Sequence, residues 1–167
     1  HSWNTGCMLL SLQQFEEGWK LFEYGLRTAA KGPQKWQRAM PKPFTNLQIG
    51  LWRGEDLSGK KILLLEEQAI GDVMQFITLL PSLFNEAAHI GLLLNNRLLT
   101  IYRRSLSKYI HSGQLSIFSF EDIQNQSLNP GDYDFQSPIG SVCQYRFIDL
   151  GSYSPLSPVL ISNEAFA

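Results

Sequence analysis

The pattern of apolar and polar positions changes character near residue 60. Downstream, short uninterrupted apolar runs predict strands at residues 61–66, 89–94 and 115–118, and amphipathic stretches predict helices at 72–85 and 97–110. Uninterrupted apolar strands are typical of a parallel sheet that helices cover on both faces. A further strand at 133–135 and a short helix at 140–147 extend the series. The sequence therefore predicts a Rossmann-like three-layer α/β domain with a parallel sheet over residues 61–150.

Residues 1–30 have a helical period instead. Apolar positions at 3–12 and 15–27 predict two short antiparallel helices, and Gly6, Gly18 and Gly25 would let these helices approach closely. The spacing of these glycines with Leu9, Phe15 and Phe22 resembles a single tetratricopeptide repeat. One repeat cannot bury its apolar face alone. The predicted hairpin therefore either packs on the following domain or belongs to a longer array.

Two segments without long regular elements flank the α/β domain. Residues 31–60 contain three prolines, yet Trp36, Phe44, Leu47, Leu51 and Trp52 make the segment too apolar for a free linker. We expect this connector to pack on the domain surface. Residues 151–167 are rich in Ser and Pro and are interpreted as a linker toward a C-terminal domain beyond the chain.

Composition excludes several classes of function. Lys and Arg number 14 against 15 Asp and Glu, a net charge of -1, which indicates neither a nucleic-acid partner nor a basic membrane patch. The longest apolar runs fall far short of the roughly 20 residues that span a bilayer. Cys7 and Cys143 are far apart and have no zinc-site spacing, so we expect no metal site and a cytoplasmic protein.

The turn at Gly71-Asp72 is the candidate for chemistry, because it follows the first predicted strand and opens a helix. Asp72 and Gln75 have the spacing of a capping box, which predicts Asp72 as the helix N-cap. Gly71 permits an unusual backbone conformation or close approach of a ligand, or it simply makes a tight turn. The single glycine excludes the Gly-x-Gly-x-x-Gly dinucleotide motif, and there is no Gly-Lys-Ser/Thr phosphate loop.

Residues 67–76, which follow the stretch Leu-Trp-Arg-Gly-Glu-Asp-Leu-Ser-Gly-Lys at 51–60, resemble a known segment. In many bacterial proteins this segment comes after tetratricopeptide repeats and opens a glycosyltransferase-like domain. The Gly71-Asp72 pair is also similar to that of the heptosyltransferase family, in which two Rossmann-like domains face each other across a cleft, the GT-B arrangement. The resemblance extends over roughly residues 18–147 and includes the stretch from Tyr133 to Pro138.

This resemblance implies the N-terminal, acceptor-side half of a glycosyltransferase-like protein. By the resemblance, Asp72 would be the general base of inverting sugar transfer. The polar residues near the turn, Glu66, Glu67, Gln68 and Gln75, could contact an acceptor or could serve only as solvated or capping groups. Gly71, Gln68 and Gln75 are the predicted substrate contacts. The implied partners are a sugar or glycosylated acceptor and, through the repeat, another protein. No cofactor is implied, and a nucleotide-sugar donor is expected only with a second domain, so that this chain alone would not transfer sugar.

Two other readings of the sequence remain open. The repeat and the sheet could form a non-catalytic scaffold for protein interaction, in which Trp19, Trp36 and Trp52 contribute to a protein or carbohydrate surface instead of internal packing. A flavodoxin-like or response-regulator-like domain is the third reading. Against it, acidic residues do not cluster at several strand ends and no phosphate-cradling loop follows the first strand.

Overall fold

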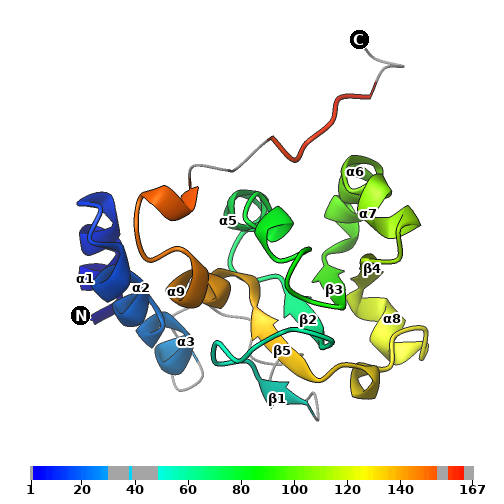
Figure 1. Ribbon diagram of the computed structural model, residues 1–167, viewed down its shortest axis with the longest axis horizontal. Coiled ribbons are helices and arrows are strands. Elements are labelled where there is room, and N and C mark those ends of the chain that lie inside the picture. Colours follow the sequence, from blue (N-terminus) through cyan, green and yellow to red (C-terminus); the bar gives the residue numbers. More distant parts are fainter. Residues whose placement is uncertain (1, 30–37, 39–48, 154–157, 164–167) are drawn as a thin grey trace.

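The computed structural model describes residues 2–29, 38, 49–153 and 158–163. Within these residues, five parallel strands form one sheet in the order β1-β5-β2-β3-β4 (Figure 1). The strands are β1 (Gly50–Leu51), β2 (Lys61–Leu65), β3 (His89–Leu94), β4 (Leu115–Ser119) and β5 (Phe135–Pro138). The predicted α/β class and the parallel sheet are confirmed, and the arrangement is Rossmann-like.

Helices surround the sheet. They are α1 (Ser2–Ser11), α2 (Phe15–Phe22), α3 (Tyr24–Ala29), α5 (Ile70–Ile77), α6 (Asn96–Ser105), α7 (Ser107–His111), α8 (Phe120–Gln124) and α9 (Cys143–Arg146). In Figure 1, α1–α3 lie at one side of the sheet beside α9, and α6 and α7 lie at the other side. Short 3-10 turns occupy Leu80–Ser82, Pro130–Asp132, Ile139–Val142 and Gly151–Tyr153. No helix among the described residues is both long and apolar enough to cross a membrane.

Both faces of the central strand β2 are buried, as its uninterrupted apolar run predicts. Ile62 and Leu64 belong to a core shared with α5, α6 and α9, whereas Leu63 and Leu65 pack on the opposite face with Leu128 and Tyr133. Successive side chains of a strand point to opposite faces, so only a doubly covered strand can be apolar at every position.

The helical hairpin α1–α2 is packed as closely as its glycines predict. A Cβ atom on Gly6 would lie 2.7 Å from the backbone nitrogen of Phe22, and one on Gly18 would lie 2.8 Å from a Leu10 side-chain carbon. Phe22 belongs to the core of the sheet, and Trp19 donates a hydrogen bond of 3.0 Å to the Tyr153 hydroxyl. The hairpin therefore packs on the α/β domain, which is one of the two predicted outcomes.

Several element boundaries differ from those predicted. Helix α5 begins two residues before the predicted start and ends at Ile77, where a 3-10 turn containing Pro81 replaces the expected last two turns. The ring of Pro81 prevents it from donating a backbone hydrogen bond, so the α-helical ladder cannot continue through it. The predicted helix 97–110 divides at Leu106 into α6 and α7, and the strand expected at 133–135 is displaced to Phe135–Pro138.

The connector packs on the domain where it is described. Residues Gly50 and Leu51 pair with β5, and Trp52 is 1% exposed, its indole donating to the Glu55 carbonyl at 2.9 Å. The expected contacts of Trp36, Phe44 and Leu47 fall outside the described residues. Part of the expected C-terminal linker also packs, because the amide of Ile161 donates to the Ser105 hydroxyl of α6 at 3.0 Å.

Candidate functional site

An open pocket of about 510 Å³ lies at the carboxyl edge of the sheet, between the ends of β2 and β3. This is the edge at which parallel α/β sheets bind ligands. Gln68 has a φ of +62°, a left-handed conformation that is uncommon for a residue other than glycine, and it turns the chain from β2 into α5. The lining residues are Glu66, Gln68, Ala69, Ile70, Gly71, Val73, Asn95 and Arg97.

Glu66 forms the charged wall of this pocket. The residue is 8% exposed, and its Oε2 accepts a hydrogen bond of 2.6 Å from the backbone amide of Asn95. Burial raises the pKa of the Glu66 carboxyl, and the hydrogen bond from Asn95 opposes that shift. Arg97 lies at the exposed rim, at the start of α6, where its amide donates to the Asn95 side chain at 3.1 Å.

Asp72 is not the N-cap that the capping-box spacing predicts. The N-cap of α5 is Ala69, in an extended conformation, and Asp72 is the third helical residue. Its Oδ2 accepts the backbone N–H of Ala69 at 3.1 Å. The left-handed Gln68 starts the helix early, so the carboxylate reaches back to the cap instead of forming it. The side chain is half-buried and does not line the pocket, although both its neighbours do.

The other predicted contact residues divide between the pocket and the helix surface. Gln68 and Gly71 line the pocket, whereas Gln75 is exposed on α5 outside the lining. Gly71 has no left-handed backbone, and a Cβ atom there would meet nothing within 4 Å. The unusual backbone considered for Gly71 is therefore found at Gln68. The substrate contacts themselves stay predictions.

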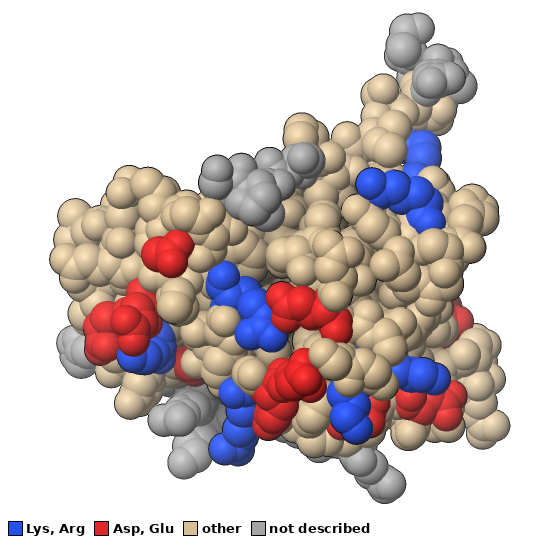
Figure 2. Space-filling model, in the orientation of Figure 1, with Lys and Arg blue, Asp and Glu red and all other residues tan. Residues whose placement is uncertain are grey.

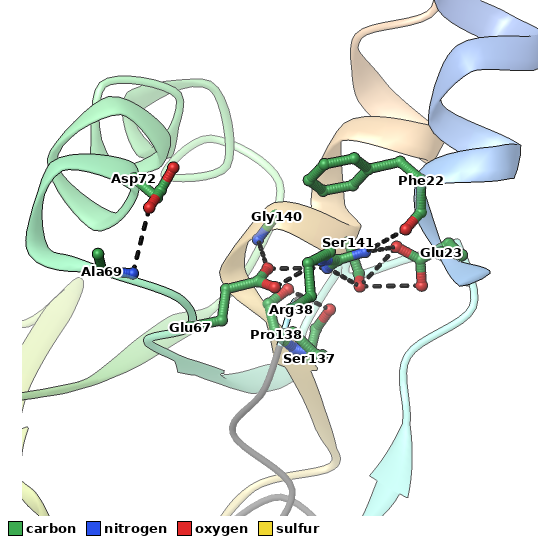
Figure 3. Close-up of polar contacts among 10 residues, drawn as sticks. All are labelled: Phe22, Glu23, Arg38, Glu67, Ala69, Asp72, Ser137, Pro138, Gly140 and Ser141. Atoms are coloured by element: carbon green, nitrogen blue, oxygen red, sulfur yellow. Dashed lines mark hydrogen bonds and ion pairs between the residues drawn. The ribbon is translucent and has the colours of Figure 1, made fainter. Parts of the chain in front are cut away.

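A second polar centre lies just beyond the carboxyl ends of β2 and β5 (Figure 3). The Arg38 side chain is fully buried and donates to both oxygens of Glu67, from Nε at 2.5 Å and from Nη2 at 2.8 Å. The backbone amide of Gly140, just after β5, donates to Glu67 Oε1 at 2.6 Å. A bidentate arginine–carboxylate pair with a further amide donor is the strong form of such an interaction.

The same guanidinium also binds the helical hairpin. Arg38 Nη1 forms a short ion pair with Glu23, which follows α2, and Nη2 donates to the Ser141 hydroxyl at 2.8 Å. The hydroxyl of Ser141 in turn donates to Glu23, and the guanidinium carbon lies 4.4 Å from the centre of the Phe22 ring. Figure 3 shows these groups converging from the hairpin, the connector and the ends of β2 and β5.

Arg38 remains a cation in this environment. Burial by itself would lower the pKa of the guanidinium, but the charges and hydrogen bonds of Glu67 and Glu23 outweigh burial and raise the pKa above its usual value. Glu67, just after β2, and Gly140, just after β5, therefore meet at a position that the protein's own Arg38 side chain occupies.

Sequence patterns did not predict this second centre. Glu67 was predicted only as a polar group near the turn that could contact an acceptor, and Arg38 stands in the proline-rich connector without a motif. The available signal was the pair Glu66-Glu67 directly after a buried strand, because a carboxylate in that position requires a cation or amide donors.

A separate pocket of about 460 Å³ lies at the opposite, amino edge of the sheet, lined in part by Lys61, His89 and Tyr133. Its position opposite the strand ends argues against a role in the chemistry expected of parallel sheets. In Figure 2, most basic side chains on the visible face lie beside acidic ones. Ion pairs such as Arg146 with Glu86 have this arrangement.

No family model matches this chain, and no solved structure matches it. The chain is similar to Protein FlbA of Caulobacter vibrioides, with 27% identity over 104 residues. The matched stretch covers 60% of this chain and 16% of FlbA, so the chain spans a small part of that relative's length. A likeness of this extent assigns no activity, substrate or partner.

Proposed function

We propose that this chain forms the acceptor-side half of a glycosyltransferase-like protein, which transfers sugar from a nucleotide sugar held mainly by a second α/β domain. The open pocket at the carboxyl ends of β2 and β3 is the observation that supports this proposal. Gln68 and Gly71, two residues from the segment that resembles glycosyltransferase-like domains, contribute to its lining.

In this proposal Asp72 is the general base. Its carboxylate takes the proton of an acceptor hydroxyl while that oxygen attacks the anomeric carbon, and the nucleotide leaves with the electron pair of the broken bond. The anomeric configuration inverts. A positioned base of this kind contributes about 10²–10⁴-fold to rate. Asp72 lies between the pocket-lining residues Gly71 and Val73, which supports its assignment to the acceptor side.

The chain contains a matched control for Asp72. Asp122 is also the third residue of a short helix after a strand, and its Oδ2 accepts the backbone amide of the N-cap residue Ser119 at 2.6 Å. Its helix follows β4 at the edge of the sheet. Substitution of either aspartate therefore weakens a helix cap, whereas only substitution of Asp72 removes the proposed base.

The test is sugar transfer by the complete natural protein, measured as nucleotide release and product mass with a panel of nucleotide sugars. We expect Asp72→Asn to lower the transfer rate by about 100-fold or more and Asp122→Asn to leave it nearly unchanged. Equal rates for the two variants would reduce Asp72 to a helix-capping residue and remove it as the base.

A non-catalytic scaffold is the second candidate, and the ion pairs of Arg38 favour it. Arg38 joins the hairpin to the end of β2 through Glu23 and Glu67. A protein of this kind would use the sheet to hold the repeat-like hairpin for a protein partner. Absence of transfer from every nucleotide sugar by the complete wild-type protein would favour the scaffold over the transferase.

A further inference from the structure

Glu66 is held in one position at the end of β2. Its backbone amide donates to the Leu93 carbonyl at 3.0 Å, which continues the pairing with β3 beyond the strand. Its Oε2 accepts the amide of Asn95 at 2.6 Å, so one carboxylate oxygen is fixed against the start of α6. The side chain thus presents its other oxygen, Oε1, in a fixed direction without further loss of conformational freedom.

Oε1 of Glu66 is available to a ligand. It accepts no hydrogen bond from any residue that the structure describes, and it is not among the polar atoms sealed inside that part of the chain. Nor does Glu66 form an ion pair within the described residues, although Arg97 lines the same pocket. The pocket therefore contains a mostly buried carboxylate that is satisfied on one side only.

The surrounding residues define the chemistry of the ligand. A carboxylate oxygen requires hydrogen donors, and its charge opposes a phosphate or another anion. Within the described part of the chain no three acidic, histidine or cysteine side chains gather to hold a metal ion. Gln68 and Arg97 can donate to ligand oxygens, and Ile70 offers an apolar contact. The volume of about 510 Å³ lies within the range of roughly 300–1,000 Å³ usual for small-molecule sites.

We propose that this pocket binds a neutral sugar, with Glu66 Oε1 accepting a sugar hydroxyl and with Gln68 and Arg97 donating to sugar oxygens. The choice of a sugar over other hydroxyl compounds rests on the proposed function. Glu66 is thereby a ligand-binding residue of the acceptor side, separate from the base role proposed for Asp72.

The test measures binding of methyl glycosides of neutral hexoses to the complete natural protein by saturation-transfer NMR and titration. Glu66→Gln keeps an oxygen for the Asn95 amide but replaces Oε1 with an amide group, and we expect binding to weaken by about ten-fold or more. The control Glu16→Gln changes an exposed glutamate on α2 and should bind as the wild type does.

Arg97→Gln provides a second variant, because Arg97 is exposed and its replacement leaves the buried core unchanged. We expect it to bind several-fold more weakly than the wild type, and this result decides the proposal if Glu66→Gln fails to fold. No binding of any methyl glycoside to the wild type overturns the proposal. Unchanged binding by a folded Glu66→Gln variant does so too, as does binding of inorganic phosphate to the wild type in preference to every methyl glycoside.

Failure of this inference can be told apart from failure of the proposed function. If the complete protein binds methyl glycosides through Glu66 but transfers no sugar, the transferase proposal fails and the sugar site stands. If transfer occurs and depends on Asp72, while Glu66→Gln leaves glycoside binding and the acceptor KM unchanged, the sugar site fails and the transferase stands.

Discussion

Glu66 and Glu67 are adjacent in sequence and chemically identical, yet they occupy opposite kinds of environment. Glu67 turns toward β5, where Arg38 and the Gly140 amide satisfy both of its oxygens in a buried site. Glu66 turns toward β3, where the Asn95 amide satisfies one oxygen at the wall of an open pocket. Both residues come just after β2 ends at Leu65, and one step along the backbone gives them different neighbours.

The difference concerns which donors reach each carboxylate. A buried charge is tolerated when a cation and hydrogen bonds compensate it, and such a group then has no capacity left for a ligand. Glu67 has reached that state and is structural. Glu66 retains an accessible oxygen, and this makes the β2–β3 side the better place to look for binding.

Removal of the Arg38 cation is expected to have the largest effect. Arg38→Met leaves Glu67 buried without its partner, and loss of one member of a buried ion pair costs about 3–5 kcal/mol. We expect this loss in the free energy of unfolding of the 167-residue chain, measured by urea denaturation with tryptophan fluorescence.

Two further variants test whether the uncompensated charge is the cause. Arg38→Met combined with Glu67→Gln should recover part of the loss, because the second change removes the stranded charge. Lys20→Met breaks the exposed pair with Glu16, whose atoms are 2.8 Å apart, and should cause no measurable change. If Arg38→Met lowered the free energy of unfolding as little as Lys20→Met does, the Arg38–Glu67 pair would not be important for stability.

Glycine substitutions are expected to change the stability of the chain by a smaller amount, and in opposite directions beside Glu67 and beside the Glu66 pocket. A Cβ atom on Gly140 would overlap Glu67 Oε1 and lie 3.0 Å from the Phe76 ring, so Gly140→Ala should destabilise the chain by about 1–3 kcal/mol. Gly71→Ala meets nothing within 4 Å and should stabilise α5 by up to about 1 kcal/mol. Thermal unfolding of both variants measures the contrast, and similar destabilisation by both would contradict it.

The smallest expected effect is a pH dependence at Glu66. Because the folded-state pKa of Glu66 is raised by burial, the folded chain binds more protons than the unfolded chain just above the ordinary value of 4.5. Stability therefore falls as pH rises through this window. Relative to the wild type, Glu66→Gln should gain stability between about pH 4 and neutral pH, as urea unfolding across that range would reveal.

Asp122→Asn gives the opposite sign and serves as the control. The backbone amide of Ser119, followed by its hydroxyl, lowers the pKa of Asp122 in the folded chain. Its contribution to stability is present above the ordinary pKa and is lost as pH falls through the lowered one. The deficit of Asp122→Asn should therefore be largest at neutral pH and vanish in acid. The same slope for both variants would show that Glu66 is not held as described.

Local sequence patterns predicted the buried strand β2 and the close packing of the helical hairpin. The doubly buried strand β2 was recognisable from Ile62 to Leu65 because both faces require apolar side chains, and the close approach at Gly6 and Gly18 followed from residue size. The start of α5 was not recognisable. Gln68 adopts a left-handed conformation that its side chain does not signal, and this moved Asp72 from the cap to the third helical position.

The pairing of Arg38 with Glu67 was beyond reach for a different reason. The two residues are 29 positions apart, and their contact depends on the tertiary arrangement of the chain. Residue types and spacing indicate that Glu67 needs a donor, but they do not identify Arg38 as that donor. The open state of the neighbouring pocket is likewise a consequence of tertiary packing, because it depends on which donors the ends of β3 and β5 supply.

The contacts of Arg38 also affect how the helical hairpin can separate from the sheet. On the hairpin side, its guanidinium binds the Phe22 carbonyl and Glu23; on the sheet side, it binds Glu67 and Ser141. If the hairpin separated from the sheet, this buried cation would lose hydrogen-bond acceptors. Opening of the hairpin alone is therefore suppressed. Slowly exchanging amide hydrogens in α2 and in residues 139–146 are expected to exchange with deuterium through one shared opening, as a single cooperative unit.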